Sequence, residues 1–503
     1  MHLLIILLQS VYTIAVTALA FYGFNALWLT WLAPRRVLTD RNKANINSQI
    51  TNQLPSVTIQ LPIYNERHVI ERLIRACTNL DYPKEKLQIQ ILDDSTDQTS
   101  MIADRCAERA ACKGYNIKIV RRTDRSGFKA GALEHAFPLA IGEFIAIFDA
   151  DFVPPIDFLL RTVPHLQQNE QLGFLQTRWG HLNTTYSPLT RSQSLALDGH
   201  FVIEQAARQF AGYAFGFNGS AGIWRRDCIA DPHVGGWQAD TLCEDLDLSY
   251  RAQLVGWQPS FLPQIEVPAE IPPQLAAFKR QQFRWAKGSI QTLRKCGWRV
   301  WQSDWSFGKR VQALVHLAGY LLHPMLLLIL LVSLPLTLLH INPAWPLAYL
   351  SIASIGPPFL YAVAQRRLHP QTWLQRWSYI GLLTLLGFGL SLNNTVAVIE
   401  ACLGRPSSFL RTPKFHVEKS SDHWHKSSYR LPLTPLFWGE IALLLYAITT
   451  AIIAGMADRW STLIFILLYI GGFGLMIGME LWERASEWVR RTGKAVFGWS
   501  TSQ

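Results

Sequence analysis

The stretch Phe144-Ile-Ala-Ile-Phe-Asp-Ala-Asp151 joins an apolar run directly to two carboxylates. The apolar run predicts a buried strand, and Asp149 and Asp151 follow it two residues apart. This spacing lets one carboxylate bind a divalent cation while the other contacts a sugar hydroxyl. Mg²⁺ and Mn²⁺ prefer oxygen ligands of this kind, often together with substrate phosphates. Alone, however, an Asp-x-Asp pattern is also compatible with a solvated strand end.

Other short apolar runs surround this stretch and alternate with helical patterns. The predicted strands are 57–62, 87–92, 117–120 and 144–148, and helices are expected around 67–79 and 97–112. Such alternation predicts an α/β domain with a mostly parallel sheet flanked by helices. Ligands of open α/β sheets bind at the carboxyl ends of the strands, and the acidic motifs fall at these ends.

Polar residues after the first two strands and before a later helix are candidates for binding a nucleotide. Tyr64 can pack on a base and Glu66 can bond a nucleoside, while Asp93 or Asp94 can accept from a nucleobase or ribose. The alternative for Asp94 and its neighbours is capping of the next helix. Lys129 follows a glycine turn and suits a diphosphate as a point charge, or is a surface lysine.

Two further motifs supply candidates for catalysis and sugar binding. Glu244 and Asp245 begin a predicted helix, and we choose Asp245 as the general base, with Asp247 as the structural alternative. In Gln281-Gln-Phe-Arg-Trp285, Arg284 can offset the charge of a leaving diphosphate and Trp285 can stack on a sugar ring. The alternative is an amphipathic surface helix before a membrane span.

Hydropathy and charge predict a membrane protein rather than a nucleic-acid-binding one. Residues 3–32 are nearly uncharged, 55–300 resemble a soluble domain, and long apolar stretches return after about 311. The net charge of +11 is concentrated in clusters at the ends of apolar stretches, which is typical of positive-inside bias. The seven cysteines are scattered and include no Cys-x-x-Cys pair, which indicates a reducing compartment and no zinc site.

The charge pattern predicts five membrane spans with the N-terminus outside and the soluble domain in the cytosol. The predicted spans are 3–32, 311–338, 345–364, 436–456 and 460–481, whereas 378–403 is expected to be interfacial or re-entrant because it contains Asn393, Asn394 and Glu400. The predicted order is an N-terminal span (1–34), a cytosolic linker (35–54), a catalytic domain (55–300), interfacial and membrane helices (301–403), a cytosolic loop (404–432), two spans (433–483) and a cytosolic tail (484–503).

Residues 57–300 closely resemble the family 2 inverting glycosyltransferases that synthesise polysaccharides, especially cellulose synthase-like A (mannan synthase) proteins and their bacterial relatives. The resemblance rests on 60–66, 92–97, 128–133, 147–152, 176–179, 215–224, 244–245 and 281–285. It implies a GT-A-type fold fused to a multi-pass helical membrane region. Two departures are Cys243, where cellulose synthases have threonine before Glu-Asp, and Arg411, where their gating loop has valine.

The resemblance also implies a role for each matching residue. Tyr64, Glu66 and Asp94 would hold the nucleoside, and Asp149 and Asp151 would hold the metal (Mg²⁺ or Mn²⁺) and the diphosphate, beside Lys129 and Arg284. Asp245 would be the base, and Gln281 and Trp285 would bind the acceptor's terminal sugar. Phe217, Asn218 and Gly219 would line the acceptor entrance, and Phe409, Thr412 and Lys414 would belong to a gating loop.

The expected activity is transfer of a sugar from GDP-mannose or UDP-glucose to a growing β-linked polysaccharide. The alternative is a glycolipid synthase that adds one sugar to diacylglycerol or a sphingolipid, and a rival from another class is a non-enzymatic transporter or scaffold. Expected partners are the nucleotide sugar, a glycan or lipid acceptor and the bilayer, with an accessory or export subunit as a further candidate and no nucleic acid. Because the soluble domain lacks plant-type insertions, a bacterial cytoplasmic membrane is favoured over the Golgi.

Overall fold

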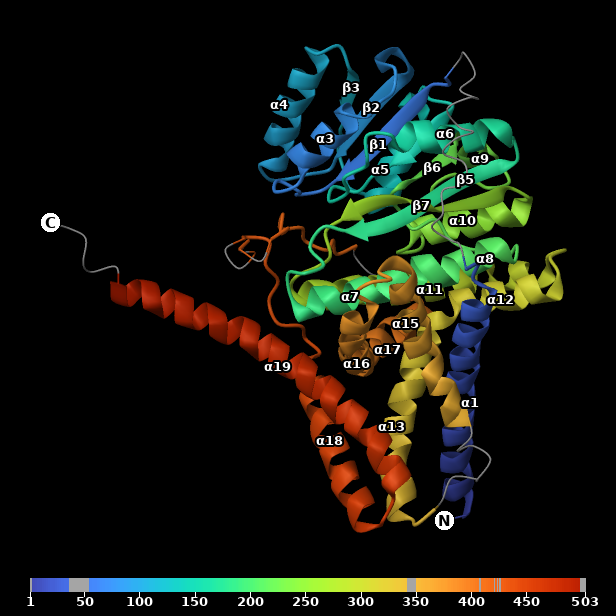
Figure 1. Ribbon diagram of the computed structural model, residues 1–503, viewed down its shortest axis with the longest axis vertical. Coiled ribbons are helices and arrows are strands. Elements are labelled where there is room, and N and C mark those ends of the chain that lie inside the picture. Colours follow the sequence, from blue (N-terminus) through green and yellow to red (C-terminus); the bar gives the residue numbers. More distant parts are fainter. Residues whose placement is uncertain are drawn as a thin grey trace.

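The computed structural model describes residues 2–35, 54–341, 350–406, 409–419, 421–422, 424 and 427–497. The predicted linker, except for its two ends, and the last six residues of the predicted tail lie outside the described residues. An α/β domain lies above a group of long helices, and the N-terminus is at the end of these helices that is remote from the domain (Figure 1).

The α/β domain is built on a seven-stranded sheet in the order β3-β2-β1-β4-β6-β5-β7. Its strands are β1 (Val57–Ile63), β2 (Leu87–Asp93), β3 (Asn116–Val120), β4 (Phe144–Ile147), β5 (Leu172–His181), β6 (Gly222–Arg225) and β7 (Gln258–Ala269). Only β6 pairs antiparallel, with β4 and β5, while the other paired neighbours are parallel. The predicted strands and mostly parallel order are confirmed.

Helices cover both faces of the sheet because the buried strands alternate their side chains between two apolar clusters. In β4, Phe144 and Ala146 belong to one cluster, whereas Ile145 and Ile147 belong to the other. The covering helices are α3 (Ile70–Thr78), α4 (Thr99–Ala111) and α6 (Phe158–Gln168) on the first face, and α5 (Phe128–Ala136) and α10 (Glu244–Val255) on the second. This two-sided burial fixes where each strand ends, and therefore where the following carboxylates lie.

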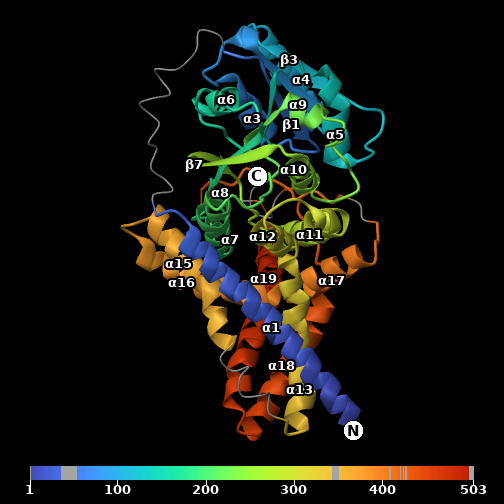
Figure 2. The same cartoon turned by 90° about the vertical axis from the view of Figure 1, so that its right-hand side faces the viewer.

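A layer of helices lies between the sheet and the long apolar helices (Figures 1 and 2). This layer comprises α7 (Pro188–Gly199), the π-helix η3 (His200–Gln205), α8 (Ala206–Phe210), α11 (Leu275–Gln302) and α12 (Phe307–Leu317). The short connections elsewhere are α9 (Arg226–Ala230) and the 3₁₀ turns η1 (Lys84–Lys86), η2 (Phe137–Leu139) and η4 (Gly319–Leu321). The longest member, α11, contacts α10 and also α17 (Ser391–Cys402) and α19 (Trp460–Phe497). It thus connects the α/β domain with the helices below.

Four helical segments in the described part of the chain are long and apolar enough to cross a membrane: His2–Leu32, Gly319–Leu338, Phe437–Met456 and Trp460–Ala485. They correspond to α1 (His2–Leu32), η4 with α13 (Leu322–Leu338), α18 (Phe437–Met456) and the first part of α19 (Trp460–Phe497). A further pair, α16 (Trp373–Gly389) and α17 (Ser391–Cys402), passes the same test together but is bent by 45°. Such a bent pair is either a broken span or a re-entrant element, so the interfacial or re-entrant element predicted at 378–403 stays a prediction.

The predicted span 345–364 is not a single long helix in the described residues. Residues 342–349 lie outside them, and the chain continues as η5 (Ser351–Ile355) and α15 (Gly356–Leu368). Pro357 stands in the first turn of α15, where the missing proline N–H is tolerated, so the helix begins anew there. Arg367 donates to the carbonyl oxygens of Ala33 and Pro34 at 3.1 Å each, so α15 ends beside the C-terminal end of α1.

Candidate active site

A cavity of about 150 Å³ collects most of the predicted site residues at the carboxyl ends of β1 and β4. The predicted residues that line it are Tyr64, Glu66, Asp94, Lys129, Asp149, Asp151, Asn218, Gly219, Asp245, Gln281, Arg284, Trp285, Phe409, Thr412 and Lys414. They come from segments separated by hundreds of residues, so the fold itself brings the motifs together.

Two predicted residues do not line this cavity. The Asp93 carboxylate is buried in β2, where it accepts from Ser95 N and Arg121 Nε at 3.0 Å each. Phe217 is buried and its ring packs against Phe174 and Trp224. Both side chains therefore have structural contacts: Asp93 stabilises the end of β2, and Phe217 stabilises the loop that carries Asn218 and Gly219.

The two carboxylates after β4 each face a lysine. Lys129 Nζ lies 2.7 Å from Asp149 Oδ1, and Lys414 Nζ lies 2.7 Å from Asp151 Oδ2. The second oxygen of Asp151, Oδ1, is buried without a hydrogen-bond partner. A hard divalent cation suits this pair, because it prefers carboxylate oxygens and would satisfy the unpartnered atom. In the described residues no group of three or more His, Cys, Asp or Glu could hold a metal, so substrate phosphate and water would complete its coordination.

Lys129 occupies the middle of the site. Its Nζ also donates to Gly219 O at 2.8 Å and lies 3.6 Å from Glu244 Oε1. Burial alone would lower the pKa of Lys129, but Asp149 and Glu244 beside it raise that pKa overall. The lysine is therefore a fixed positive charge, as binding of a diphosphate requires.

Because Gly219 has no side chain, Asp245 and Lys129 can both approach the loop that contains it. Its φ is +79°, and a Cβ built there would lie 2.7 Å from Asp245 Oδ2. A side chain at this position would therefore strain the backbone and displace the carboxylate.

We expect Gly219→Ala to lower the rate of sugar transfer about 10²-fold, because a displacement of about 1 Å of a catalytic group has an effect of this size. Gly212→Ala is a matched control: Gly212 also has a left-handed φ, +67°, but a Cβ added there would meet no neighbouring atom within 4 Å. Initial rates of both variants in one assay give the comparison, and equal rates would contradict the proposed contact.

Asp245 lies in the first turn of α10 and lines the cavity. Burial and the negative charge of the adjacent Glu244 raise the pKa of Asp245 to about 7, although Lys129 partly opposes the shift. A carboxylate that titrates near neutrality is well suited to accept a proton from a hydroxyl group. The geometry thus agrees with the choice of Asp245 as the base.

The pH dependence of the reaction should follow this carboxylate. Because Asp245 acts only when deprotonated, kcat/KM is expected to rise with pH through about 7 and then to level off. Glu244→Gln removes a like charge that raises the pKa of Asp245, so the inflection should move to lower pH. A pH–rate profile that is the same in wild type and variant would refute this assignment.

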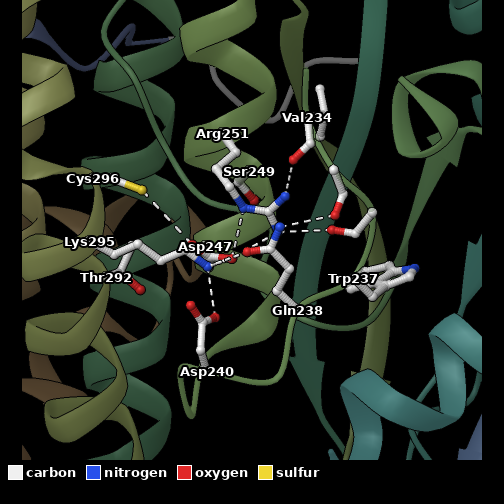
Figure 3. Close-up of polar contacts among 12 residues, drawn as sticks. Val234, Trp237, Gln238, Asp240, Asp247, Ser249, Arg251, Thr292, Lys295 and Cys296 are labelled. Carbon is white, nitrogen blue, oxygen red and sulfur yellow. Dashed lines mark hydrogen bonds and ion pairs between the residues drawn. The ribbon is translucent and has the colours of Figure 1, made fainter. Parts of the chain in front are cut away.

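Asp247, the residue with the structural interpretation, belongs to a buried ionic network (Figure 3). Its side chain is fully buried and accepts from Arg251 Nε at 2.9 Å and Lys295 Nζ at 3.0 Å. Arg251 also donates to the carbonyl oxygens of Val234 and Gly236, which lie in the loop before α10. The network therefore fixes the first turn of α10, two residues after Asp245, and takes no direct part in proton transfer.

We expect Asp247→Ala to lower the free energy of unfolding by about 3–5 kcal/mol, because it leaves the buried Arg251 guanidinium without its carboxylate. Asp240 supplies the control: it also pairs with Lys295, at 2.7 Å, but its side chain is 57% exposed. Asp240→Ala should therefore cost about 1 kcal/mol or less. Thermal unfolding of both variants in the same detergent tests the difference, and similar losses would show that the network is not the stabilising element.

The nucleoside end of the cavity contains residues to which the sequence alone gave no role. The Arg125 guanidinium lies 3.4 Å from the centre of the Tyr64 ring, and its Nε is buried without a hydrogen-bond partner. Arg411 Nη1 lies 3.0 Å from Glu66 Oε2, although burial still raises the pKa of Glu66 to about 8. Arg122 holds both oxygens of Asp94.

The described residues of the segment 409–430, which carries the predicted gating residues, cover the cavity. Phe409 stacks on Phe128 with ring centres 5.8 Å apart, and Phe415 N and His416 N donate to Glu270 at 2.9 Å each. The buried Thr412 hydroxyl lines the cavity without a hydrogen-bond partner. This docked segment explains how Lys414 reaches Asp151.

The acceptor candidates share one face of α11. Gln281, Arg284 and Trp285 are spaced by three and four residues, which places them side by side on a helix, and all three line the cavity. Sequence reasoning missed Arg125, Glu270 and the contact of Arg411 with Glu66. Arg411 gave a signal as a departure from the gating pattern, but a single glutamate such as Glu270 has no local signature.

Comparisons with known proteins identify relatives of the α/β domain. The sequence model for "Glycosyltransferase like family 2" matches residues 55–288. The chain is 45% identical over 248 residues to probable glucomannan 4-beta-mannosyltransferase 7 of Oryza sativa subsp. japonica, covering 48% of this chain and 42% of that protein. It is 41% identical over 251 residues to glucomannan 4-beta-mannosyltransferase 9 of Arabidopsis thaliana, covering 49% and 46%.

Among solved structures, the mannosyltransferase PcManGT of Pyrobaculum calidifontis, in complex with GDP-Man and Mn²⁺, superposes with a TM-score of 0.48 and 21% identity, covering 78% of this chain and 99% of that one. The chain spans less than half the length of the two curated relatives named above. Both are plant proteins, so the comparisons do not support the bacterial membrane that the missing insertions favoured. Residues 55–288 are therefore a family 2 glycosyltransferase domain.

Proposed function

We propose that this chain is a membrane-embedded, inverting glycosyltransferase that extends a β-linked polysaccharide from a nucleotide sugar. The observation that carries the proposal is the convergence of Asp245, the Asp149–Asp151 pair, Lys129 and Trp285 on one cavity. Together they supply a base, a site for a divalent cation, a fixed positive charge and a surface for a sugar ring.

The unsatisfied polar atoms of the cavity support binding of a polar ligand. Asp151 Oδ1, Thr412 Oγ1, Asn218 Oδ1, Arg125 Nε and Arg284 Nε are all buried without hydrogen-bond partners, and their residues line the cavity. Leaving buried polar atoms unpaired is costly, so such a set indicates a site that is completed by its ligand. A sugar linked to a nucleoside diphosphate presents the required donors and acceptors.

The reaction follows from these positions. Asp245 accepts the proton of an acceptor hydroxyl while that oxygen attacks the anomeric carbon, and the bond from that carbon to the diphosphate oxygen breaks. Lys129 and Arg284 stabilise the charge that develops on the departing diphosphate, an electrostatic effect that is commonly the largest in catalysis. When bound at Asp149 and Asp151, Mg²⁺ or Mn²⁺ would add Lewis-acid stabilisation of the same charge. A single displacement of this kind inverts the anomeric configuration.

The relatives favour mannose as the transferred sugar and a polysaccharide as the product. Both curated relatives are named glucomannan 4-beta-mannosyltransferases, so GDP-mannose is our first candidate donor and UDP-glucose the second. The docked segment 409–430 supports a polymerising enzyme, because Phe409, Thr412 and Lys414 all line the cavity as a gating loop would. Transfer of one sugar to diacylglycerol or a sphingolipid is the second candidate function, which the candidate spans favour by giving a lipid access to the domain.

We also infer that the α/β domain and the segment 404–432 lie on the same, cytosolic side of the membrane, with the N-terminus opposite. This orientation rests on the basic residues at helix ends, such as Arg35 and Arg367. Arg367 lies beside the C-terminal end of α1. The domain boundaries and the accessory subunit stay predictions.

Product analysis tests the proposed function. Purified protein in nanodiscs is incubated with Mg²⁺ or Mn²⁺ and, separately, labelled GDP-mannose and UDP-glucose, after which polymeric and lipid-extractable label are counted. Polymeric label from one donor is the expected result and names that donor. Label confined to the lipid phase would instead establish the glycolipid synthase, and no transfer from either donor would reject both candidates.

A further inference from the structure

Two buried lysines bracket the acceptor-binding face of α11. Lys279 precedes Gln281 by two residues, and Lys287 follows Trp285 by two, and their side chains are 1% and 0% exposed. Lysine is almost never fully buried unless it is paired. Each of these two side chains reaches away from the α/β domain and pairs with a carboxylate of the helices below.

The first lysine forms a buried triad with the last two candidate spans. Lys279 Nζ lies 2.7 Å from Glu440 Oε2 in α18 and 2.9 Å from Glu480 Oε2 in α19. The two carboxylates are 0% and 4% exposed, so all three charges are removed from solvent. Lys279 also offers its carbonyl oxygen to Asn393 Nδ2 of α17 at 3.1 Å.

The same junction contains two further polar contacts to α19, one from α11 and one from the residues before α18. Leu275 N, at the start of α11, donates to Glu483 Oε1 of α19 at 2.9 Å. Thr434 N, just before α18, donates to Glu480 Oε1 at 3.2 Å. The beginning of α11 is therefore tied to α18 and α19 through directed bonds rather than through apolar packing alone.

The second lysine makes a corresponding contact with the bent helix pair. Lys287 Nζ lies 2.7 Å from Glu400 Oε2 in α17, whose side chain is 28% exposed. Gln281, Arg284 and Trp285 thus lie between two ionic contacts that reach three different helices outside the α/β domain.

The placement of these charges is energetically expensive, and apolar side chains of similar volume would join the helices at no greater cost. Charged residues inside membrane-spanning segments are rare and generally functional. What an ion pair adds over an apolar contact is a defined geometry, because its oxygens and nitrogen must meet at hydrogen-bond distance. A defined geometry is what a helix that presents a sugar-binding platform to a catalytic base requires.

We propose that Lys279 and Lys287 are positioning residues that hold the acceptor-binding segment 281–285 in register with α17, α18 and α19. The carboxylates of Glu400, Glu440 and Glu480 thereby make the membrane helices part of the acceptor site. The inference rests on the proposed function, since it assigns a role in binding the acceptor's terminal sugar. It concerns α11, whereas Tyr64, Glu66 and Asp94, the residues assigned to the nucleoside, lie on other elements.

The kinetic test compares Lys279→Met with Lys279→Arg in nanodiscs, using a soluble oligosaccharide acceptor and the donor that the product analysis names. We expect Lys279→Met to lower kcat/KM for the acceptor about 10²-fold, mainly through KM, as a small displacement of a positioning helix would. The dissociation constant of the nucleoside alone should change less than about twofold, because the nucleoside end of the cavity is untouched. Lys279→Arg keeps the charge and should restore most of the acceptor affinity.

A triple variant distinguishes positioning from simple stabilisation. Lys279→Met combined with Glu440→Gln and Glu480→Gln removes all three charges, so it should fold with a melting temperature near that of wild type. Positioning predicts that the acceptor KM of this variant stays high. Full recovery of the acceptor KM, or equal losses of nucleoside and acceptor binding in Lys279→Met, would overturn the proposal.

A readout without catalysis keeps this test separate from the proposed function. Hydrogen exchange of wild type and Lys279→Met should show faster exchange of the α11 amides around 278–288, with β1 and β2 unchanged. This result is expected even if neither donor is used, in which case the proposed function fails alone. Unchanged exchange of α11 would overturn the positioning role by itself.

Discussion

Replacing Asp245 by asparagine is expected to lower kcat about 10³–10⁴-fold while leaving the fold and nucleotide binding intact. General-base catalysis contributes an effect of this order, and asparagine has the size of aspartate but cannot accept the proton. The neighbouring carboxylates cannot take over, since Glu244 faces Lys129 and Asp247 is buried in its own ionic network.

The measurement is the initial rate of sugar transfer, together with the dissociation constant of the nucleoside diphosphate and the melting temperature. Both controls should match wild type, because Asp245 contacts neither the nucleoside end of the cavity nor the core. A variant that transfers sugar at more than about one tenth of the wild-type rate would remove Asp245 from the role of base.

Replacing Asp151 by asparagine is expected to abolish tight binding of Mn²⁺ and to lower kcat about 10²–10³-fold. The loss has the size seen when one electrostatic stabiliser of a developing charge is removed. Asp149 alone cannot compensate, because one of its oxygens already lies 2.7 Å from Lys129 Nζ. Replacing Asp151 tests metal binding more specifically than replacing Asp149, since Asp151 Oδ1 is buried without a hydrogen-bond partner.

Mn²⁺ binding measured by electron paramagnetic resonance in the presence of a nucleoside diphosphate tests this prediction apart from activity. Asp157→Asn is the control, because this carboxylate pairs only loosely with Arg161, at 3.5 Å, and does not line the cavity. The control should bind Mn²⁺ like wild type. Undiminished Mn²⁺ binding by Asp151→Asn, or full activity in excess chelator, would contradict the assigned metal site.

The strands and their carboxylates were predictable because local pattern and burial agree there. An apolar run such as 144–148 can only be buried between helices, so the position of Asp149 at its end follows from the sequence. The same reasoning placed Asp245 at the start of a helix, and the structure has α10 begin at Glu244.

Contacts between distant segments were not predictable in the same way. Lys414 and Asp151 are 263 residues apart, and neither hydropathy nor spacing indicates that their side chains meet. The buried triad of Lys279, Glu440 and Glu480 joins three helices whose apolar patterns gave no reason to pair these charges.

At two positions the described residues differ from the expectation, and each difference has a cause in the local chain. Asp93 and Asp94 are adjacent, and the strand alternation sends one carboxylate into the sheet and the other toward the cavity. The segment 345–364 is apolar enough for a span, but Gly356 and the two prolines after it start a new, shorter helix. Composition alone does not resolve either case.

The stereochemistry of a single transfer tests the central claim most directly. An α-configured nucleotide sugar and a short acceptor are incubated with the protein and the metal ion, and the anomeric proton of the product is followed by NMR. The mechanism predicts a β-linked product from wild type and none above background from Asp245→Asn. An α-linked product would contradict single displacement with Asp245 as base, whatever donor the protein uses.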